Sequence, residues 1–117
     1  MGRGIGIIFK SGFKMKLISK GIKLSYEYLE VNFIAQGYNI ILLIVYRPPY
    51  SQANSVTTNV FFDKFESHLD SLIVKSGKLM LIGDFNIHMD NLTNNDCKKF
   101  NDILNTYGLI NNIDFCT

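Results

Sequence analysis

The sequence is poor in the residues that mark disulfide-bonded, zinc-binding or membrane-spanning proteins. It has no tryptophan and only two cysteines, Cys97 and Cys116, which lack CxxC spacing and so predict neither a disulfide framework nor a zinc site. No apolar run approaches the roughly 20 residues of a membrane helix, and the N-terminal run 5–9 is too short for a signal peptide. We therefore expect reduced thiols, no membrane association and an intracellular location, nuclear or cytoplasmic.

Charged residues are also scarce, at 19% of the 117 residues, and the net charge is only +2. With an apolar fraction of 47%, this composition is typical of a single folded globular domain. The charge is unevenly placed, because residues 1–26 contain no acid and six basic side chains: Arg3, Lys10, Lys14, Lys16, Lys20 and Lys23. Such a basic end could follow a phosphate backbone. For any single lysine, a solvated hairpin that protects a sheet edge is the commoner explanation.

Hydrophobic periodicity predicts an α/β protein. Apolar residues that alternate with polar ones indicate a strand with one wet face, and uninterrupted apolar runs indicate strands buried on both faces. Phenylalanine and leucine at helical spacing indicate two amphipathic helices, the second ending at Gly108. In chain order we expect strands over 4–10, 26–35, 39–46 and 78–84, helices over 59–75 and 96–107, and the start of a strand within 109–117.

The order strand, helix, strand over residues 39–84 predicts a right-handed crossover between two parallel strands. Parallel strands end at the same edge of a sheet. We therefore expect Tyr46 and Arg47, which end the first strand, to lie beside Asp84 and Asn86, which follow the second. In open α/β sheets this edge is where ligands bind.

The segment LIGDFNIHMD, residues 81–90, places several polar side chains directly after the second buried strand. Its spacing resembles a calcium loop, but an EF-hand needs Asp or Asn, Gly and Glu where this chain has His88, Met89 and Asn95. The segment does not predict a zinc site either, because His88 has no second soft ligand nearby and His68 is expected on the helix surface. The remaining chemistry is that of a phosphate-processing site.

In such a site Asp84 could hold a hard cation or handle a proton, and the Asn86 amide could donate a hydrogen bond to a phosphoryl oxygen without adding charge. Tyr46 and Arg47 would bring a phenol and a cation to the same edge. A structural explanation remains open for each residue. Asp84 and Asn86 could be turn residues that bond their own backbone, and Tyr46 could be an amphipathic ring at a strand end.

Four segments in fixed order resemble the endonuclease/exonuclease/phosphatase superfamily: YRPP at 46–49, FFDKFESHLDSLI at 61–73, GKLMLIGDFNIHMD at 77–90 and KFNDILNTYGLI at 99–110. The similarity includes GRGIGIIFK at the start and is greatest to the apurinic-type endonuclease domain of non-LTR (LINE-type) retrotransposon reverse transcriptases. It implies part of a DNase I-like four-layer α/β sandwich, with mixed sheets and flanking helices, that hydrolyses DNA or other phosphate esters with Mg²⁺ or Mn²⁺.

By this resemblance Asp84 would act on the proton of the attacking water or leaving group and contribute weakly to the metal site. Asn86 would hydrogen-bond the scissile phosphate, Tyr46 would contact it, and Arg47 would be a secondary contact to the DNA backbone. The superfamily also has an asparagine and a metal-binding glutamate upstream, and an Asp-His pair downstream, for which this sequence has no match. We therefore expect the middle of such a domain, either a remnant or part of a larger polyprotein, with weak magnesium binding and slow or absent hydrolysis.

Three functions remain open on the sequence alone. The first is a DNA endonuclease, the second a non-catalytic nucleic-acid-binding or interaction module, and the third a phosphomonoesterase of the same superfamily. A domain without its flanks should leave sheet edges and apolar faces uncovered. We therefore predict aggregation or weak folding cooperativity for the purified chain.

Overall fold

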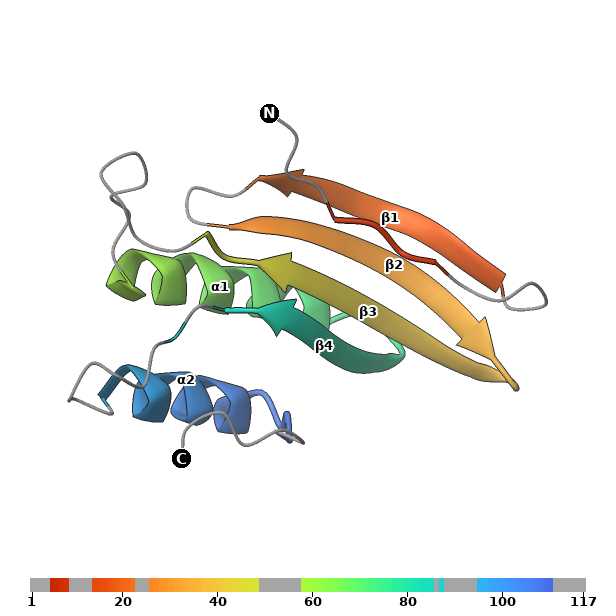
Figure 1. The fold of residues 1–117 in the computed structure, drawn as a ribbon. Coiled ribbons are helices and arrows are strands. Elements are labelled where there is room, and N and C mark those ends of the chain that lie inside the picture. Colours follow the sequence, from red (N-terminus) through yellow and green to blue (C-terminus); the bar gives the residue numbers. More distant parts are fainter. Residues whose placement is uncertain are drawn as a thin grey trace.

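The computed structural model describes residues 5–8, 14–22, 26–48, 58–85, 87 and 95–110. They form a small α/β domain with a four-stranded mixed sheet and two helices (Figure 1), so the predicted α/β class is confirmed. The elements, in chain order, are β1 (Lys14–Ile22), β2 (Glu27–Ala35), β3 (Tyr38–Tyr46), α1 (Thr58–Ile73), β4 (Lys78–Asp84) and α2 (Asn95–Thr106).

The sheet has the strand order β1-β2-β3-β4. β2 pairs with β1 and β3 in antiparallel register, whereas β3 and β4 are parallel, as the crossover through α1 predicts. A two-residue turn joins β2 to β3, and both of its residues have positive φ, 51° at Gln36 and 81° at Gly37. Tight hairpin turns of this kind match the twist of the strands that they connect.

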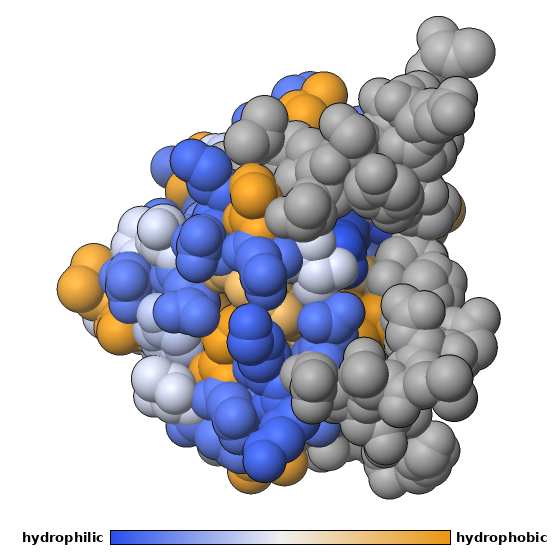
Figure 2. Space-filling view, turned by 90° about the vertical axis from the view of Figure 1, so that its left-hand side faces the viewer, coloured by the Kyte–Doolittle hydropathy of each residue, from blue (hydrophilic) through white to orange (hydrophobic). Residues whose placement is uncertain are grey.

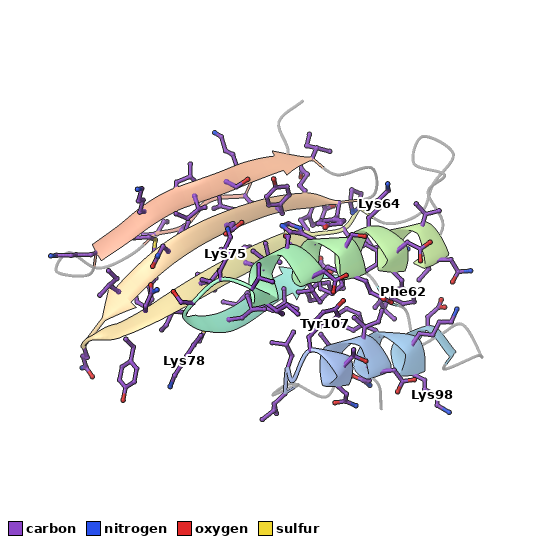
Figure 3. All side chains as sticks on the ribbon, turned by 180° about the vertical axis from the view of Figure 1, so that it is seen from behind. Phe62, Lys64, Lys75, Lys78, Lys98 and Tyr107 are labelled. Atoms are coloured by element: carbon purple, nitrogen blue, oxygen red, sulfur yellow. The ribbon has the colours of Figure 1, made fainter. Side chains whose placement is uncertain are left out.

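One face of the sheet, here called the helix face, packs against both helices (Figures 1 and 3). Ile41, Leu43 and Val45 of β3 belong to the buried core, and Leu79 and Leu81 of β4 pack against it. The helices supply the aromatic part of this core with Phe61, Phe62, Phe65 and Phe100. Alternate residues of the apolar run in β3 thus point into the main core.

The opposite face, here called the outer face, carries the alternate residues of each strand. On β4 it is open, because Met80 is 48% exposed and Ile82 is 51% exposed. On β2 it is closed, because Leu29 and Val31 are buried although they lie outside the main core cluster. In Figure 1 residues 5–8 cross in front of β1 and β2 on this side. The outer face is therefore buried on β2 and exposed to solvent on β4.

The N-terminal region differs from the sequence-based expectation. Residues 5–8 form no strand, so the strand predicted over 4–10 is wrong for the part of it that the structure describes. The strand is β1 instead, an edge strand whose Lys14, Lys16 and Lys20 are exposed. This placement agrees with lysines that protect a sheet edge. Of the strand expected in 109–117, residues 109 and 110 are not in a strand and the others lie outside the described residues.

His68 is a second correction, because it is buried rather than on the helix surface. Its Nδ1 lies 2.7 Å from the Tyr26 hydroxyl, and the two rings stack with centroids 5.9 Å apart. Burial, with a smaller contribution from Tyr28, raises the pKa of the Tyr26 phenol. The sequence gives no sign of this pair, since Tyr26 precedes β2 and reaches α1 only in the folded chain.

The helices among the described residues are too short or too polar to cross a membrane.

Candidate functional site

Tyr46 and Asp84 end the parallel strands β3 and β4 and are register partners. The backbone N–H of Arg47 donates a hydrogen bond of 2.9 Å to the carbonyl oxygen of Asp84, so the two strands stay paired to their last residues. The predicted meeting of these residues at one sheet edge is confirmed. Figure 2 looks onto this end of the molecule, where hydrophilic side chains predominate among the described residues.

Both side chains lie on the outer face. Val45 and Leu81 belong to or pack against the core on the helix face, and successive residues of a strand point to opposite faces. Tyr46 is half-buried and Asp84 is exposed. The phenol and the carboxylate therefore leave the same face of the sheet from neighbouring strands, and the carboxylate is exposed to solvent.

The backbone on either side of Asp84 is held from the helix face. The Cβ atom of any side chain at Gly83 would collide with the Val45 carbonyl oxygen, so only glycine fits at this position. The Phe85 ring packs on Phe100, with centroids 4.8 Å apart. Gly83 thus allows β4 to approach β3 closely, and Phe85 anchors the chain just after the carboxylate.

Arg47 is buried and ties this edge to the start of α1. Its guanidinium donates hydrogen bonds to the Phe85 carbonyl oxygen (3.3 Å) and to the Thr58 hydroxyl (2.8 Å), and it lies 4.8 Å from the Phe61 ring centroid. Burial lowers the pKa of Arg47, while the charge of Asp96 acts in the opposite direction. These contacts give Arg47 a structural role, and its contact with DNA stays a prediction.

Asn86, His88 and Asp90 lie outside the described residues, so the predicted role of Asn86 remains a prediction. In the described part of the chain, no three His, Cys, Asp or Glu side chains are grouped so that they could hold a metal ion. A cation at this edge would therefore depend on fewer protein ligands together with water and substrate oxygens, an arrangement that is common for Mg²⁺.

A second carboxylate, which the sequence analysis did not single out, lies next to Tyr46. Glu27 is the first residue of β2 and the register partner of Tyr46. Its neighbour Tyr28 packs against the core on the helix face, so Glu27 points to the outer face. Its Oε2 is buried and has no hydrogen-bond partner. Glu27, Tyr46 and Asp84, here called the edge row, thus form one line across three strands.

The other glutamate of β2 has a different environment. Glu30 lies on the helix face, where its Oε2 accepts a hydrogen bond of 2.6 Å from the Lys75 ammonium group. Lys75, labelled in Figure 3, follows the end of α1. Within the sequence YEYLE the two glutamates look alike. The face of the strand decides that one is paired within the fold and the other is not.

A hollow of about 370 Å³ lies between α1 and α2, on the helix side of the sheet and away from the edge row. Phe62 and Tyr107 line it (Figure 3), together with Asp63, Glu66 and Asp102. Tyr107 donates a hydrogen bond of 2.6 Å to Asp70, and this bond raises the pKa of Tyr107 to about 12. The hollow contributes no residue to the predicted phosphate site.

No protein-family model, curated protein or solved structure matches this chain.

Proposed function

We propose that the chain carries part of a metal-dependent phosphodiesterase site, of the DNA endonuclease type found in the endonuclease/exonuclease/phosphatase superfamily. The observation that supports this proposal most is the register pairing of Tyr46 with Asp84 at the carboxyl edge of two parallel strands. This edge is the usual ligand site of open α/β sheets. Two of the four segments that carry the resemblance contain residues of this edge, because YRPP begins at Tyr46 and GKLMLIGDFNIHMD contains Asp84.

The side chains expected at this edge suit the chemistry of phosphodiester hydrolysis. Asp84 offers a hard carboxylate that can hold a cation or accept a proton from the attacking water. Tyr46 offers a hydroxyl group that can donate a hydrogen bond to a phosphoryl oxygen, and Asn86 would add an uncharged donor. Arg47 stabilises this arrangement, because its guanidinium donates hydrogen bonds to the Phe85 carbonyl oxygen and to Thr58 at the start of α1.

The donor chemistry of the site fits Mg²⁺ or Mn²⁺. Both are hard cations that prefer carboxylate oxygen and water, and Mg²⁺ usually binds through one or two carboxylates together with substrate phosphates. Glu27 adds a buried, unpartnered carboxylate oxygen to the same row. The bound cation would neutralise charge on the phosphoryl group, while Asp84 and Tyr46 position the water and the phosphate.

The exposed apolar residues on the outer face of β4 support the larger fold that the proposal implies. A four-layer sandwich has two sheets packed face to face, and each sheet then needs an apolar face without helices. Met80 and Ile82 provide apolar surface on the outer face of β4. We propose that in the complete protein a second sheet covers this face.

The test is nicking of supercoiled plasmid DNA that carries abasic sites, in Mg²⁺ or Mn²⁺. We expect slow nicking by the chain and a loss of about 100-fold or more in the Asp84→Ala variant, as for removal of a group that acts in the transition state. Asp102→Ala, an exposed acid on α2, is the control and should nick at the wild-type rate. Equal nicking by wild type and Asp84→Ala, or nicking by neither, would remove the catalytic proposal.

The exposed lysines of β1 favour one second candidate, a nucleic-acid-binding module without catalysis. Lys14, Lys16 and Lys20 are exposed on the edge strand of the sheet. If the chain binds duplex DNA with a steep salt dependence but does not cut it, this candidate replaces the first. Release of phosphate from an inositol phosphate, without nicking of DNA, would instead identify a phosphomonoesterase of the same superfamily.

A further inference from the structure

We infer that Arg47 is a positioning residue of the proposed site and fixes the place of the Asp84 carboxylate through the main chain of Asp84 and Phe85. The inference rests on the proposed function for the identity of the site. Its own evidence is that Arg47 binds two successive carbonyl groups, those of Asp84 and Phe85. The resemblance to the superfamily assigns Arg47 a contact to the DNA backbone instead, and the two roles predict different kinetics.

Arg47 holds the point at which the chain leaves β4. Its backbone N–H donates a hydrogen bond of 2.9 Å to the Asp84 carbonyl oxygen, and its guanidinium donates one of 3.3 Å to the Phe85 carbonyl oxygen. Successive carbonyl groups of a regular strand point to opposite sides, so one residue of a neighbouring strand does not ordinarily bind both. Arg47 binds both because β4 ends at Asp84. The two bonds fix the peptide units on either side of Phe85, and the first of these units is attached to the Asp84 Cα.

The guanidinium is itself held in place, as a group that positions another must be. Arg47 is only 5% exposed. A hydrogen bond of 2.8 Å to the Thr58 hydroxyl ties it to the start of α1, and the Phe61 ring centroid lies 4.8 Å away, within the range of a cation–π contact. The Phe85 ring in turn packs on Phe100 of α2, with centroids 4.8 Å apart. Arg47 and Phe85 therefore join the end of β4 to both helices.

The same contacts argue against a role of Arg47 in binding DNA. The Asp84 side chain leaves the outer face and is exposed, whereas the Arg47 guanidinium contacts α1 on the helix side of the sheet. A hydrogen bond from the guanidinium to a DNA phosphate would require it to leave these partners and its buried position. Arg47 therefore affects the substrate through the position of Asp84 and not through a contact of its own.

The arrangement needs the shape of arginine as well as its charge. The planar guanidinium donates to Phe85 and Thr58 from different nitrogen atoms, while its central carbon lies over the Phe61 ring. A lysine ammonium is a compact charge on a flexible stem and does not reproduce this geometry. Arg47→Lys therefore keeps the positive charge and removes the fixed geometry. Thr58→Val removes only the bond to α1 and leaves the bond to the Phe85 carbonyl oxygen, so it is the matched control.

The first experiment measures kcat and KM for nicking of abasic plasmid DNA in Mg²⁺. In Arg47→Lys we expect kcat to fall at least about tenfold with KM unchanged, because a misplaced reacting group costs rate and not substrate binding. Thr58→Val should keep the wild-type kcat, although both variants should melt at a lower temperature. A raised KM with a weaker salt dependence in Arg47→Lys would show a DNA contact, and an unchanged kcat would show a purely structural role. Either result overturns the inference.

Carbon NMR of the isotope-labelled chain gives a second readout that needs no activity. It observes the Phe85 carbonyl carbon and the Asp84 carboxyl carbon. We expect both signals to shift in Arg47→Lys and to keep their wild-type positions in Thr58→Val, because only the first variant releases the Phe85 carbonyl oxygen. Arg47→Gln puts no charge into the buried site and replaces Arg47→Lys if that variant does not fold. An unchanged Asp84 signal in the folded variant overturns the inference.

The outcomes separate this inference from the proposed function. If wild type does not nick DNA, the catalytic proposal falls, and the two NMR signals decide by themselves whether Arg47 holds Asp84 in place. If wild type nicks DNA and needs Asp84, but Arg47→Lys nicks at the wild-type rate, the phosphodiesterase proposal stands and the positioning role is overturned. A fall of kcat together with a shifted Asp84 signal supports both.

Discussion

The strands β3 and β4 present apolar side chains on both faces of the sheet, but the two faces are buried to different extents. On β3, Leu43 and Val45 of the helix face are fully buried under α1 and α2, while Leu42 and Ile44 of the outer face are only half-buried. On β4, Met80 and Ile82 of the outer face are about half exposed. Apolar character therefore shows that a face can be covered, but it does not show that the same chain covers it.

The two faces also differ in whether their polar side chains are paired within the fold. On the helix face Glu30 forms an ion pair with Lys75, and His68 of α1 is hydrogen-bonded to Tyr26. On the outer face Glu27 has a buried oxygen without a partner, and Asp84 is exposed. These polar groups of the helix face are paired within the fold, whereas those at the edge of the outer face are the ones that we propose for ligand binding.

The comparison is tested most strongly by truncating neighbouring leucines of β3. Leu43→Ala should destabilise the fold by about 2–5 kcal/mol, because it leaves a cavity in the core under the helices. Leu42→Ala should cost only about 1 kcal/mol, because the side chain is already partly in water. Urea unfolding of both variants measures the difference. Equal costs would mean that the outer face is packed as tightly as the helix face.

A smaller effect is expected from the ion pair on the helix face. Glu30→Gln should destabilise the fold by about 1 kcal/mol, since the amide keeps the shape but loses the charge, and the exposed Lys75 side chain limits the loss. Urea unfolding at low and high salt provides the measurement. Glu27→Gln is the matched change on the outer face and should not destabilise the metal-free chain. A greater loss in Glu27→Gln would reverse the comparison.

At the outer edge of the helix layer, Tyr107→Phe removes the hydrogen bond to Asp70 and should cost about 0.5 kcal/mol. The pKa of Tyr107 is raised to about 12 in the fold, so its stabilising contribution is complete below the ordinary tyrosine pKa of 10.0. The contribution is lost as the pH rises from there through 12. Unfolding at pH 8 and above pH 11 should show the difference between wild type and variant shrinking. A constant difference would contradict this assignment.

The smallest change in stability is expected for Ile82→Lys on the outer face, within about 0.5 kcal/mol, as for an exposed position. The added charge should nevertheless reduce aggregation, because exposed apolar patches promote association. Val74→Lys, at an 81% exposed residue just after α1, adds the same charge away from this face and should reduce aggregation less. Sedimentation velocity compares the two variants. A large loss of stability in Ile82→Lys would show that the domain itself covers the face.

The sequence predicted most elements closely because their signals are local. The strands β2, β3 and β4 and both helices begin and end within two residues of their predicted bounds. The strand β1 was not predicted, because the alternation of residues 14–17 breaks at Ile18, where the pairing with β2 is also irregular. The apolar run in 4–10 predicted a strand, but residues 5–8 pair with no neighbouring strand. Edge positions depend on available partners, which a local pattern does not contain.

The candidate site was partly predictable for the same reason. The meeting of Tyr46 with Asp84 follows from the parallel crossover, and the register confirms it. The burial of Arg47 and the place of Glu27 were missed. Arg47 turns inward because Thr58, Phe61 and the Phe85 carbonyl oxygen surround it, and these groups come from distant parts of the chain. Glu27 joins the site only through the pairing of β2 with β3.

By itself the sequence determined both helices, three of the four strands of the sheet, and the position of two polar motifs at the ends of neighbouring parallel strands, because periodicity and chain order are local properties. Only the tertiary structure decided which glutamate of β2 is neutralised, that His68 is buried and where the outer face of the sheet stays exposed. Those outcomes depend on the side of the sheet that α1 and α2 occupy, and packing against distant segments sets that side.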